Sequence, residues 1–280
     1  MEYKNLVEAS LMTVVNLVNE VFKDYIVPVH WTIQSFEKDI VENSISLENS
    51  FVAYDKNEPI GFSIVSVRGE RGRIDSIGLL KKYRGTGISS EILTRTMETL
   101  KWKGIRDVVL EVEENEKRAV KFYQKHNFKL KRKLESLKYN IKKSEDPEYK
   151  YLPEDGKWVH DMAVSALNNL HRKPNWQREP KTLGLSEGRY IVEKIVSKGF
   201  AIGYIVWGTN EDNAFIVDIS PIADETKYYD IFKDALKRIA SEKNKVIMVS
   251  VPSDDLLNKV AKELNFEPFL IQWEMEKKIH

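Results

Sequence analysis

The sequence lacks cysteine altogether, and this absence narrows the chemistry open to the chain. Without thiols there is no disulfide framework, no thiolate metal site and no cysteine nucleophile. The chain also lacks an apolar run of the roughly 18 residues needed to span a bilayer, and its first residues lack the basic and then apolar order of a signal peptide. We therefore expect a soluble, cytoplasmic protein with no membrane partner.

The sequence also lacks a large excess of positive or of negative side chains. Lys and Arg number 44 against 43 Asp and Glu, which leaves a formal net charge of +1. Such a balance gives no general attraction for nucleic acid, so we expect none as a partner. The five histidines are scattered and form no HxxxH or HExxH spacing, so no metal is predicted. Specific sites must carry the function.

An internal repeat is the clearest large-scale pattern. The Ile-Gly pair at 60–61 recurs at 202–203, and the Asn-Phe pair at 127–128 recurs at 265–266. A period of about 140 residues predicts two tandem copies of one fold rather than a solenoid. The sequence leaves the oligomeric state open.

The length of 280 residues also favours two domains. We expect domains at 1–142 and 157–280. The stretch 143–156 contains two prolines, five acidic residues and no apolar periodicity, so we interpret it as an exposed linker.

Hydrophobic periodicity predicts an α/β (α+β) protein, in which each domain has a mixed, mostly antiparallel sheet flanked by helices. The first half is expected to have a possible edge strand, helices at 11–25, 32–44, 88–104 and 116–128, and strands at 50–56, 60–69, 73–80 and 107–115, followed by one or two closing strands at 129–142. The second half is expected to have a helical stretch after the linker, strands at 189–199, 200–208, 213–222, 245–253 and 267–275, and helices at 228–243 and 254–266.

The stretch 79–90, LLKKYRGTGISS, places two glycines and an arginine between a strand and a helix. The first amides of a helix have no internal partner and lie at the positive end of its dipole, so small residues there let a phosphate approach the backbone. Gly85 and Gly87 permit that approach. Neither a P-loop nor a Rossmann spacing is present, which argues against nucleotide hydrolysis and nicotinamide chemistry. The alternative is a tight surface turn.

The surroundings of this loop resemble the GNAT superfamily of acyl-CoA-dependent N-acetyltransferases over residues 1–142. The stretch 84–89, RGTGIS, is similar to the family's diphosphate motif Q/R-x-x-G-x-G/A, with serine in the last small position. The stretch 110–128, LEVEENEKRAVKFYQKHNF, is similar to the family's strand and helix beside the thioester. The whole chain resembles tandem GNAT proteins that have one degenerate half.

This resemblance implies that backbone groups hold acetyl-CoA. The pantetheine arm would bond Ile77, Gly78 and Leu79, and the diphosphate would bond the loop and the helix start. The loop and helix-start residues are Arg84, Gly85, Thr86, Gly87, Ile88, Ser89 and Ser90. Two residues depart from the family pattern: Asn115 lies one position before the family's cofactor-facing asparagine, and Asn127 stands where a glycine usually precedes the phenylalanine.

Direct attack on the thioester requires a neutral amine, so a base or a water relay should exist. The resemblance implies Glu111 as this base and Tyr123 as the acid that reprotonates the thiolate. Glu111 has an alternative interpretation as one member of an exposed acidic run, and Tyr123 as a core aromatic. Asp75 is a second candidate base if it is partly buried, although a charge at a strand end is the more common explanation.

The acceptor site is expected near the first two helices, where Asp24, Tyr25, His30 and Trp31 mix a carboxylate with aromatic faces. Packing of Tyr25 and Trp31 within the helix hairpin is the alternative. The substrate would be a small-molecule or peptide amine. The function expected is N-acetyl transfer in a ternary complex, and the alternative is a non-catalytic acyl-CoA-binding regulatory protein.

The second half is expected to be degenerate. Its stretch 218–232, which matches the glycine loop, contains no glycine. Asp224 and Glu225 stand there where phosphates would have to lie, and like charges repel.

Overall fold

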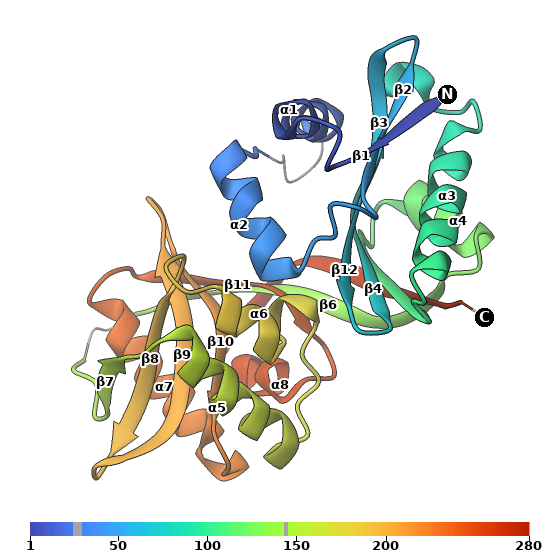
Figure 1. Cartoon of the computed structure of the whole chain (residues 1–280). Coiled ribbons are helices and arrows are strands. Elements are labelled where there is room, and N and C mark those ends of the chain that lie inside the picture. Colours follow the sequence, from blue (N-terminus) through green and yellow to red (C-terminus); the bar gives the residue numbers. More distant parts are fainter. Residues whose placement is uncertain (25–29, 143–144, 280) are drawn as a thin grey trace. The chain divides into compact units, whose positions relative to one another are not determined.

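The computed structural model describes residues 1–24, 30–142 and 145–279, whose backbone contacts form two compact units (Figure 1). Unit 1 consists of Met1–Val112, Lys121–Leu130 and Glu274–His280, and unit 2 consists of Glu113–Val120 and Lys131–Trp273. The segment expected to be a linker contains a short strand, β7 (Lys150–Pro153). The functional domain boundaries expected from the sequence stay a prediction.

Unit 1 is built on an antiparallel meander followed by a parallel strand. Its strands are β1 (Glu2–Asn5), β2 (Phe51–Asp55), β3 (Glu58–Arg68), β4 (Arg71–Leu79) and β5 (Asp107–Glu113). Their order in the sheet is β1-β2-β3-β4-β5, and only the β4–β5 pair is parallel. The expected meander is confirmed.

Helices cover both faces of this sheet (Figure 1). Helices α1 (Leu11–Phe22) and α2 (Ile33–Asn43) pack on one face, and α3 (Ile88–Trp102) packs on the other. The Ser10 side chain caps α1 by accepting from the Thr13 amide, and Thr32 and Ser35 form a capping box on α2. Helix α1 ends three residues before its expected end, and Tyr25 lies outside the described residues.

Strand β4 contains a bulge, after which it separates from β5. Ser76 pairs with Ile64 and Ile74 pairs with Val65, so Asp75 is the extra residue between them. The parallel pairing of β4 with β5 begins at Arg71 and stops at Ile74. The end of β4 is therefore paired with β3 on one side, and its other side is open to a ligand.

Unit 2 repeats this architecture. Its strands are β6 (Lys129–Asn140), β7, β8 (Ile191–Ser197), β9 (Phe200–Thr209), β10 (Ala214–Pro221), β11 (Lys245–Pro252) and β12 (Glu267–Lys278), of which β6 and β12 have residues in both units. Its helices are α5 (Gly156–Asn169), α6 (Pro180–Leu185), α7 (Tyr228–Ala240) and α8 (Leu256–Glu263). Helix α4 (Lys117–Lys125) also has residues in both units.

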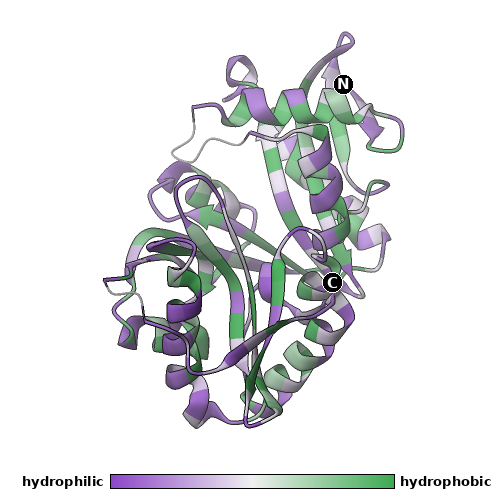
Figure 2. Ribbon diagram, turned by 90° about the vertical axis from the view of Figure 1, so that its left-hand side faces the viewer, coloured by the Kyte–Doolittle hydropathy of each residue, from purple (hydrophilic) through white to green (hydrophobic). Residues whose placement is uncertain are grey.

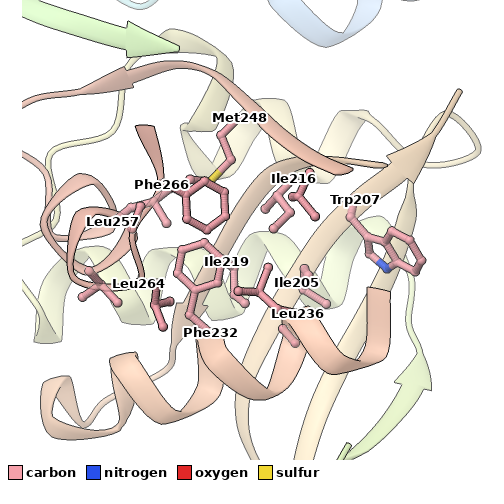
Figure 3. Close-up of a cluster of buried hydrophobic side chains, with 14 of the residues drawn as sticks. Ile205, Trp207, Ile216, Ile219, Phe232, Leu236, Met248, Leu257, Leu264 and Phe266 are labelled. Atoms are coloured by element: carbon pink, nitrogen blue, oxygen red, sulfur yellow. The ribbon is translucent and has the colours of Figure 1, made fainter. Parts of the chain in front are cut away.

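The main core of unit 2 lies between its sheet and helices α7 and α8. Side chains such as Ile205 and Ile219 from the strands meet Phe232 from α7 and Leu257 from α8 (Figure 3). Helix α5 packs on the other face of the sheet. Figure 2 shows hydrophobic residues along the strands and hydrophilic residues at the turns. No helix in the described ranges is long and apolar enough to cross a membrane.

The register of the two copies confirms the repeat. In β10 the bulged residue is Val217, which lies 142 positions after Asp75. Asn127 and Asn265 both have a left-handed backbone, with φ of 67° and 65°. Each asparagine ends its helix in a Schellman turn and is followed by a buried phenylalanine. Asparagine tolerates this conformation, which explains its presence where the family usually has glycine.

Candidate functional site

The end of β4 presents the backbone groups expected to hold the pantetheine arm. Ile77, Gly78 and Leu79 pair with β3 and lie beyond the last residue that pairs with β5. Gly78 is required there, because a Cβ at this position would lie 2.7 Å from Val21 of α1 and 2.7 Å from the Phe62 ring. The close approach of α1 thus depends on this glycine.

The glycine loop exposes its backbone in the way that an anion requires. Gly85 and Gly87 have φ of +83° and +91°, and a Cβ at either position would meet nothing within 4 Å. The Thr86 hydroxyl donates to the Tyr83 carbonyl at 2.6 Å and closes the turn. Hydrogen bonds of α3 begin with the Ser90 amide, which donates to the Gly87 carbonyl at 3.0 Å. The earlier amides of a helix have no partner within it, which is the arrangement that an anion site uses.

The remaining predicted loop residues lie at the start of α3. Ile88, Ser89 and Ser90 form its first turn. The Arg84 side chain contacts the protein itself: its Nε donates to the Leu79 carbonyl at 3.1 Å, and its Nη2 lies 3.4 Å from the Val21 carbonyl. Arg84 therefore links the loop to β4 and to the end of α1, and its contact with a diphosphate stays a prediction.

Tyr123 lies on α4 among aromatic rings. Its ring centroid is 5.3 Å from that of Phe122 and 5.8 Å from that of Phe128, both in edge-to-face geometry. Phe128 is buried and Tyr123 is half-buried. Asn115 is exposed and belongs to residues 113–120 of unit 2, where its side chain contacts Glu113 at 3.4 Å. The catalytic role of Tyr123 and the cofactor contact of Asn115 stay predictions.

A cluster of charged side chains lies where β4 and β5 separate. Arg73 Nη1 is 3.3 Å from Asp75 Oδ1, and Arg73 Nη2 is 3.8 Å from Glu111 Oε1. All three side chains are only 10% exposed. The Ser66 hydroxyl of β3 donates a short hydrogen bond to Asp75. Asp75 thus lies inside β4 and not at a strand end, and Glu111 is more enclosed than the exposed acidic run of its alternative interpretation.

Burial raises the pKa of the Asp75 carboxyl to about 6, from an ordinary value of 3.8. Arg73, the Ser66 hydroxyl and Arg68 act in the opposite direction, while the charge of Glu111 raises the pKa further. Desolvation of the charged form is the largest of these effects. Sequence analysis missed Arg73, although the alternation of charged and apolar residues in RGRIDSIG could have revealed it.

The matching positions of unit 2, all of which the structure describes, hold apolar residues instead of this cluster. Gly72 pairs with Val108 in unit 1, and Ala214 pairs with Val246 in unit 2. These two pairs align the strands of the two units, so each residue of the cluster has an equivalent position in unit 2. Arg73, Asp75 and Glu111 correspond to Phe215, Val217 and Val249, and the Schellman turns match Tyr123 to Ala261. Asp224, in the stretch that matches the glycine loop, accepts from the Thr226 amide of the chain itself.

The strand ends of unit 2 are bridged by the chain's own side chains. Arg172 is buried and binds Asp218 of β10 at 2.9 and 3.0 Å and Asp255 at 3.0 Å. Arg178 donates to the carbonyls of Val249 and Ser250 in β11, at 2.6 and 3.1 Å. The segment 172–178 thus connects the separated ends of β10 and β11.

Of the residues expected to line the acceptor site, Trp31 stacks on Phe36 of α2, with ring centroids 4.6 Å apart, which supports its packing role. Asp24 and His30 are exposed, on either side of the segment 25–29, which lies outside the described residues. In the part of the chain that the structure describes, no group of three or more histidine or acidic side chains is arranged to hold a metal ion.

Residues 15–128 match the family model described as "Acetyltransferase (GNAT) family". Over 86 residues the chain is 35% identical to N-alpha-acetyltransferase 30 of Schizosaccharomyces pombe, which covers 29% of this chain and 57% of that protein. The chain therefore spans little more than half the length of this curated relative.

Two solved structures are similar to the chain over nearly its whole length. One is a tandem GNAT protein from the clavulanic acid biosynthesis pathway, with a TM-score of 0.70, 12% identity, and coverage of 99% of this chain and 98% of that chain. The other is a GCN5-related N-acetyltransferase from Sphaerobacter thermophilus, with a TM-score of 0.68, 10% identity, and coverage of 95% and 91%. At these identities the likeness shows the fold, and it confirms the tandem arrangement.

Proposed function

We propose that this chain, which carries a GNAT-family acetyltransferase domain in residues 15–128, transfers an acetyl group from acetyl-CoA to a primary amine. The observation that carries the proposal is the combination of an open strand end in β4 with a glycine loop at the start of α3. Acetyl-CoA supplies the activated acyl group. Direct attack by the amine needs no covalent intermediate on the protein.

The residues of unit 1 divide between binding and chemistry. The backbone of Ile77 to Leu79 would bind the pantetheine arm, and the amides from Gly85 to Ser90 would bind the diphosphate. Tyr123 would return a proton to the leaving thiolate. The proton acceptor would be Glu111, Asp75 or a water relay. In unit 2 the stretch that matches the glycine loop, 218–232, has no glycine and carries Asp224 and Glu225, so this unit would bind no second acetyl-CoA.

The α-amine of a polypeptide is the first acceptor class to test, because it needs the least help from a base. Its pKa of about 7.7–8.0 means that deprotonation at pH 7 costs roughly 1 kcal/mol. A lysine side chain, with a pKa near 10.4, costs roughly 4–5 kcal/mol. The similarity to an N-alpha-acetyltransferase over 86 residues supports the same choice.

The test is incubation of the purified chain with acetyl-CoA and two peptides, with products identified by mass spectrometry. One peptide has a free α-amine and no lysine, and the other has a blocked N-terminus and one lysine. We expect acetylation of the free α-amine that depends on the chain. Binding of acetyl-CoA without transfer to either peptide would contradict the proposal and favour a regulatory acyl-CoA-binding protein.

A further inference from the structure

The duplication within the chain shows that the same strand arrangement also forms without a charged cluster. The second copy of the same bulged strand forms with apolar residues at the three places that hold Arg73, Asp75 and Glu111 in unit 1. Buried charges are generally no more stabilising than apolar residues of similar size. The charges in unit 1 therefore require an explanation other than stability.

Asp75 lies at the bulge of β4, next to the strand end that the proposed function assigns to the pantetheine arm. The Asp75 side chain shares the face of the sheet that carries Ser66 and Arg73, because residues two positions apart on a strand point to the same side and Ser66 donates to the Asp75 carboxylate. This face is opposite to α3, since a Cβ on the preceding Gly72 would approach Leu100 of α3. Asp75 also follows directly on Ile74, the last residue of β4 that pairs with β5.

We propose that Asp75 takes the proton from the acceptor amine, and that Arg73 is a positioning residue that holds the carboxylates of Asp75 and Glu111 on one face of the sheet. This inference rests on the proposed acetyl transfer and names the base within it. Glu111 is then left to orient the amine by accepting one of its N–H bonds.

The acceptor amine enters the reaction as an ammonium ion, which must lose two protons to become an amide nitrogen. The acceptor loses one proton to the Asp75 carboxylate, and its lone pair forms the new C–N bond. The C–S bond breaks, and the sulfur keeps the electron pair and takes the Tyr123 hydroxyl proton. The second proton lost from nitrogen restores Tyr123 through water, and Asp75 releases its proton to solvent, so one proton leaves for each amide formed.

The environment of Asp75 suits this role. Ser66 and Arg68 face it from β3, Arg73 from β4 and Glu111 from β5, and Arg68 also donates to the Glu42 carbonyl of α2. Burial brings the pKa of the Asp75 carboxyl to about 6, so the base is ionised at neutral pH but binds a proton more readily than an exposed aspartate.

The experiment measures kcat and KM against pH for the wild-type chain, Asp75→Asn, Asp75→Val and Glu111→Gln, with the lysine-free peptide as acceptor. Asp75→Val introduces the residue type found at the matching place of unit 2, so it is compatible with the fold. Both Asp75 variants should lower kcat by about 100-fold or more and remove the fall in activity below pH 6. Glu111→Gln should raise the KM for the peptide and keep that fall.

The positioning role of Arg73 is tested by a shift in the pH dependence of kcat/KM, which a purely structural role would not cause. Loss of its charge in Arg73→Met should move the acidic limb of kcat/KM upward by about one pH unit or more, because Arg73 lowers the pKa of Asp75. Arg73→Lys should return the limb toward its wild-type position. Asp107→Asn, at the exposed start of β5, is the matched control and should leave both constants unchanged.

The outcomes separate this inference from the proposed function. If the wild-type chain acetylates the peptide and Asp75→Asn keeps both the rate and the acidic limb, Asp75 is not the base although the transferase activity stands. If Glu111→Gln removes the acidic limb instead, the base is Glu111. If the wild-type chain acetylates neither peptide, the proposed function fails, and the assignment of Asp75 fails with it.

Discussion

Tyr123 shows how a single residue can be tested for chemistry against packing. Its ring makes edge-to-face contacts with Phe122 and Phe128, and a phenylalanine at this position would preserve both. If the hydroxyl reprotonates the thiolate, Tyr123→Phe should lower kcat by about 100-fold or more. The measurement is steady-state kinetics with the lysine-free peptide, together with a titration of acetyl-CoA. An unchanged kcat would assign Tyr123 to the core alone.

Asp75 should make the stability of the chain depend on pH. The pKa of its carboxyl is about 6 in the folded chain and near 3.9 in the unfolded chain, so the folded state binds the proton more tightly. The contribution of this group to stability is therefore greatest below about pH 4 and is lost as the pH rises through 6. At pH 7.5 the loss is roughly 2–3 kcal/mol.

Asp75→Asn removes this titration. The variant should melt at a higher temperature than the wild-type chain at pH 7.5, and the difference should shrink toward pH 4.5. The measurement is thermal unfolding across this range, with Asp107→Asn as the control. A variant that is less stable at pH 7.5 would show that the Asp75 carboxylate is held mainly by favourable contacts with Arg73 and Ser66.

For single residues, the sequence predicts the backbone conformation of the loop glycines better than it predicts which side chains contact each other. Gly85 and Gly87 have the left-handed backbone that the loop was expected to need. Arg73 was missed as the centre of a cluster, because one of its two partners, Glu111, lies on a different strand, and the pairing of distant strands leaves little local pattern in the sequence.

At the scale of elements, the glycine loop is the feature most sensitive to change. Gly87 has φ of +91°, a conformation that valine adopts only with strain. Gly87→Val should therefore distort the first turn of α3 and weaken acetyl-CoA binding by about tenfold or more, the equivalent of one lost charge-assisted hydrogen bond. The measurement is the dissociation constant from calorimetry.

The chain supplies a matched control for this substitution. Gly69, in the turn between β3 and β4, also has positive φ, +58°, and open space around it. Gly69→Val should lower stability by a similar backbone effect and leave the dissociation constant unchanged. Equal weakening by both substitutions would mean that strain, rather than the loop, controls binding.

The order and type of the main elements follow from periodicity, and most of their bounds lie within a few residues of those expected. Asn127 and Asn265 were expected to mark a repeat, and the structure adds that both cap a helix with left-handed geometry. The strand β7 was missed, because Lys150–Pro153 is a segment of only four residues at the edge of its sheet and depends on pairing with β8. Such tertiary pairing leaves little local pattern.

At the scale of the whole molecule, one fold is used twice, and we propose a ligand site in only one of the two copies. In unit 1 the open end of β4 is followed by a glycine loop, whereas in unit 2 the ends of β10 and β11 are bridged by Arg172 and Arg178. Arg172 forms ion pairs with Asp218 and Asp255, so the buried guanidinium has its charge partners within the chain and needs no ligand. The chain should therefore bind one acetyl-CoA.

The most direct test of this account is a calorimetric titration of the full chain with acetyl-CoA, repeated on Gly87→Val. We expect one equivalent to bind the wild-type chain and much weaker binding to the variant. At about 100 times the dissociation constant, the ligand should also add roughly 2.7 kcal/mol to the free energy of unfolding. No binding, two equivalents, or equal affinity of the variant would contradict a single acyl-donor site at the glycine loop of unit 1.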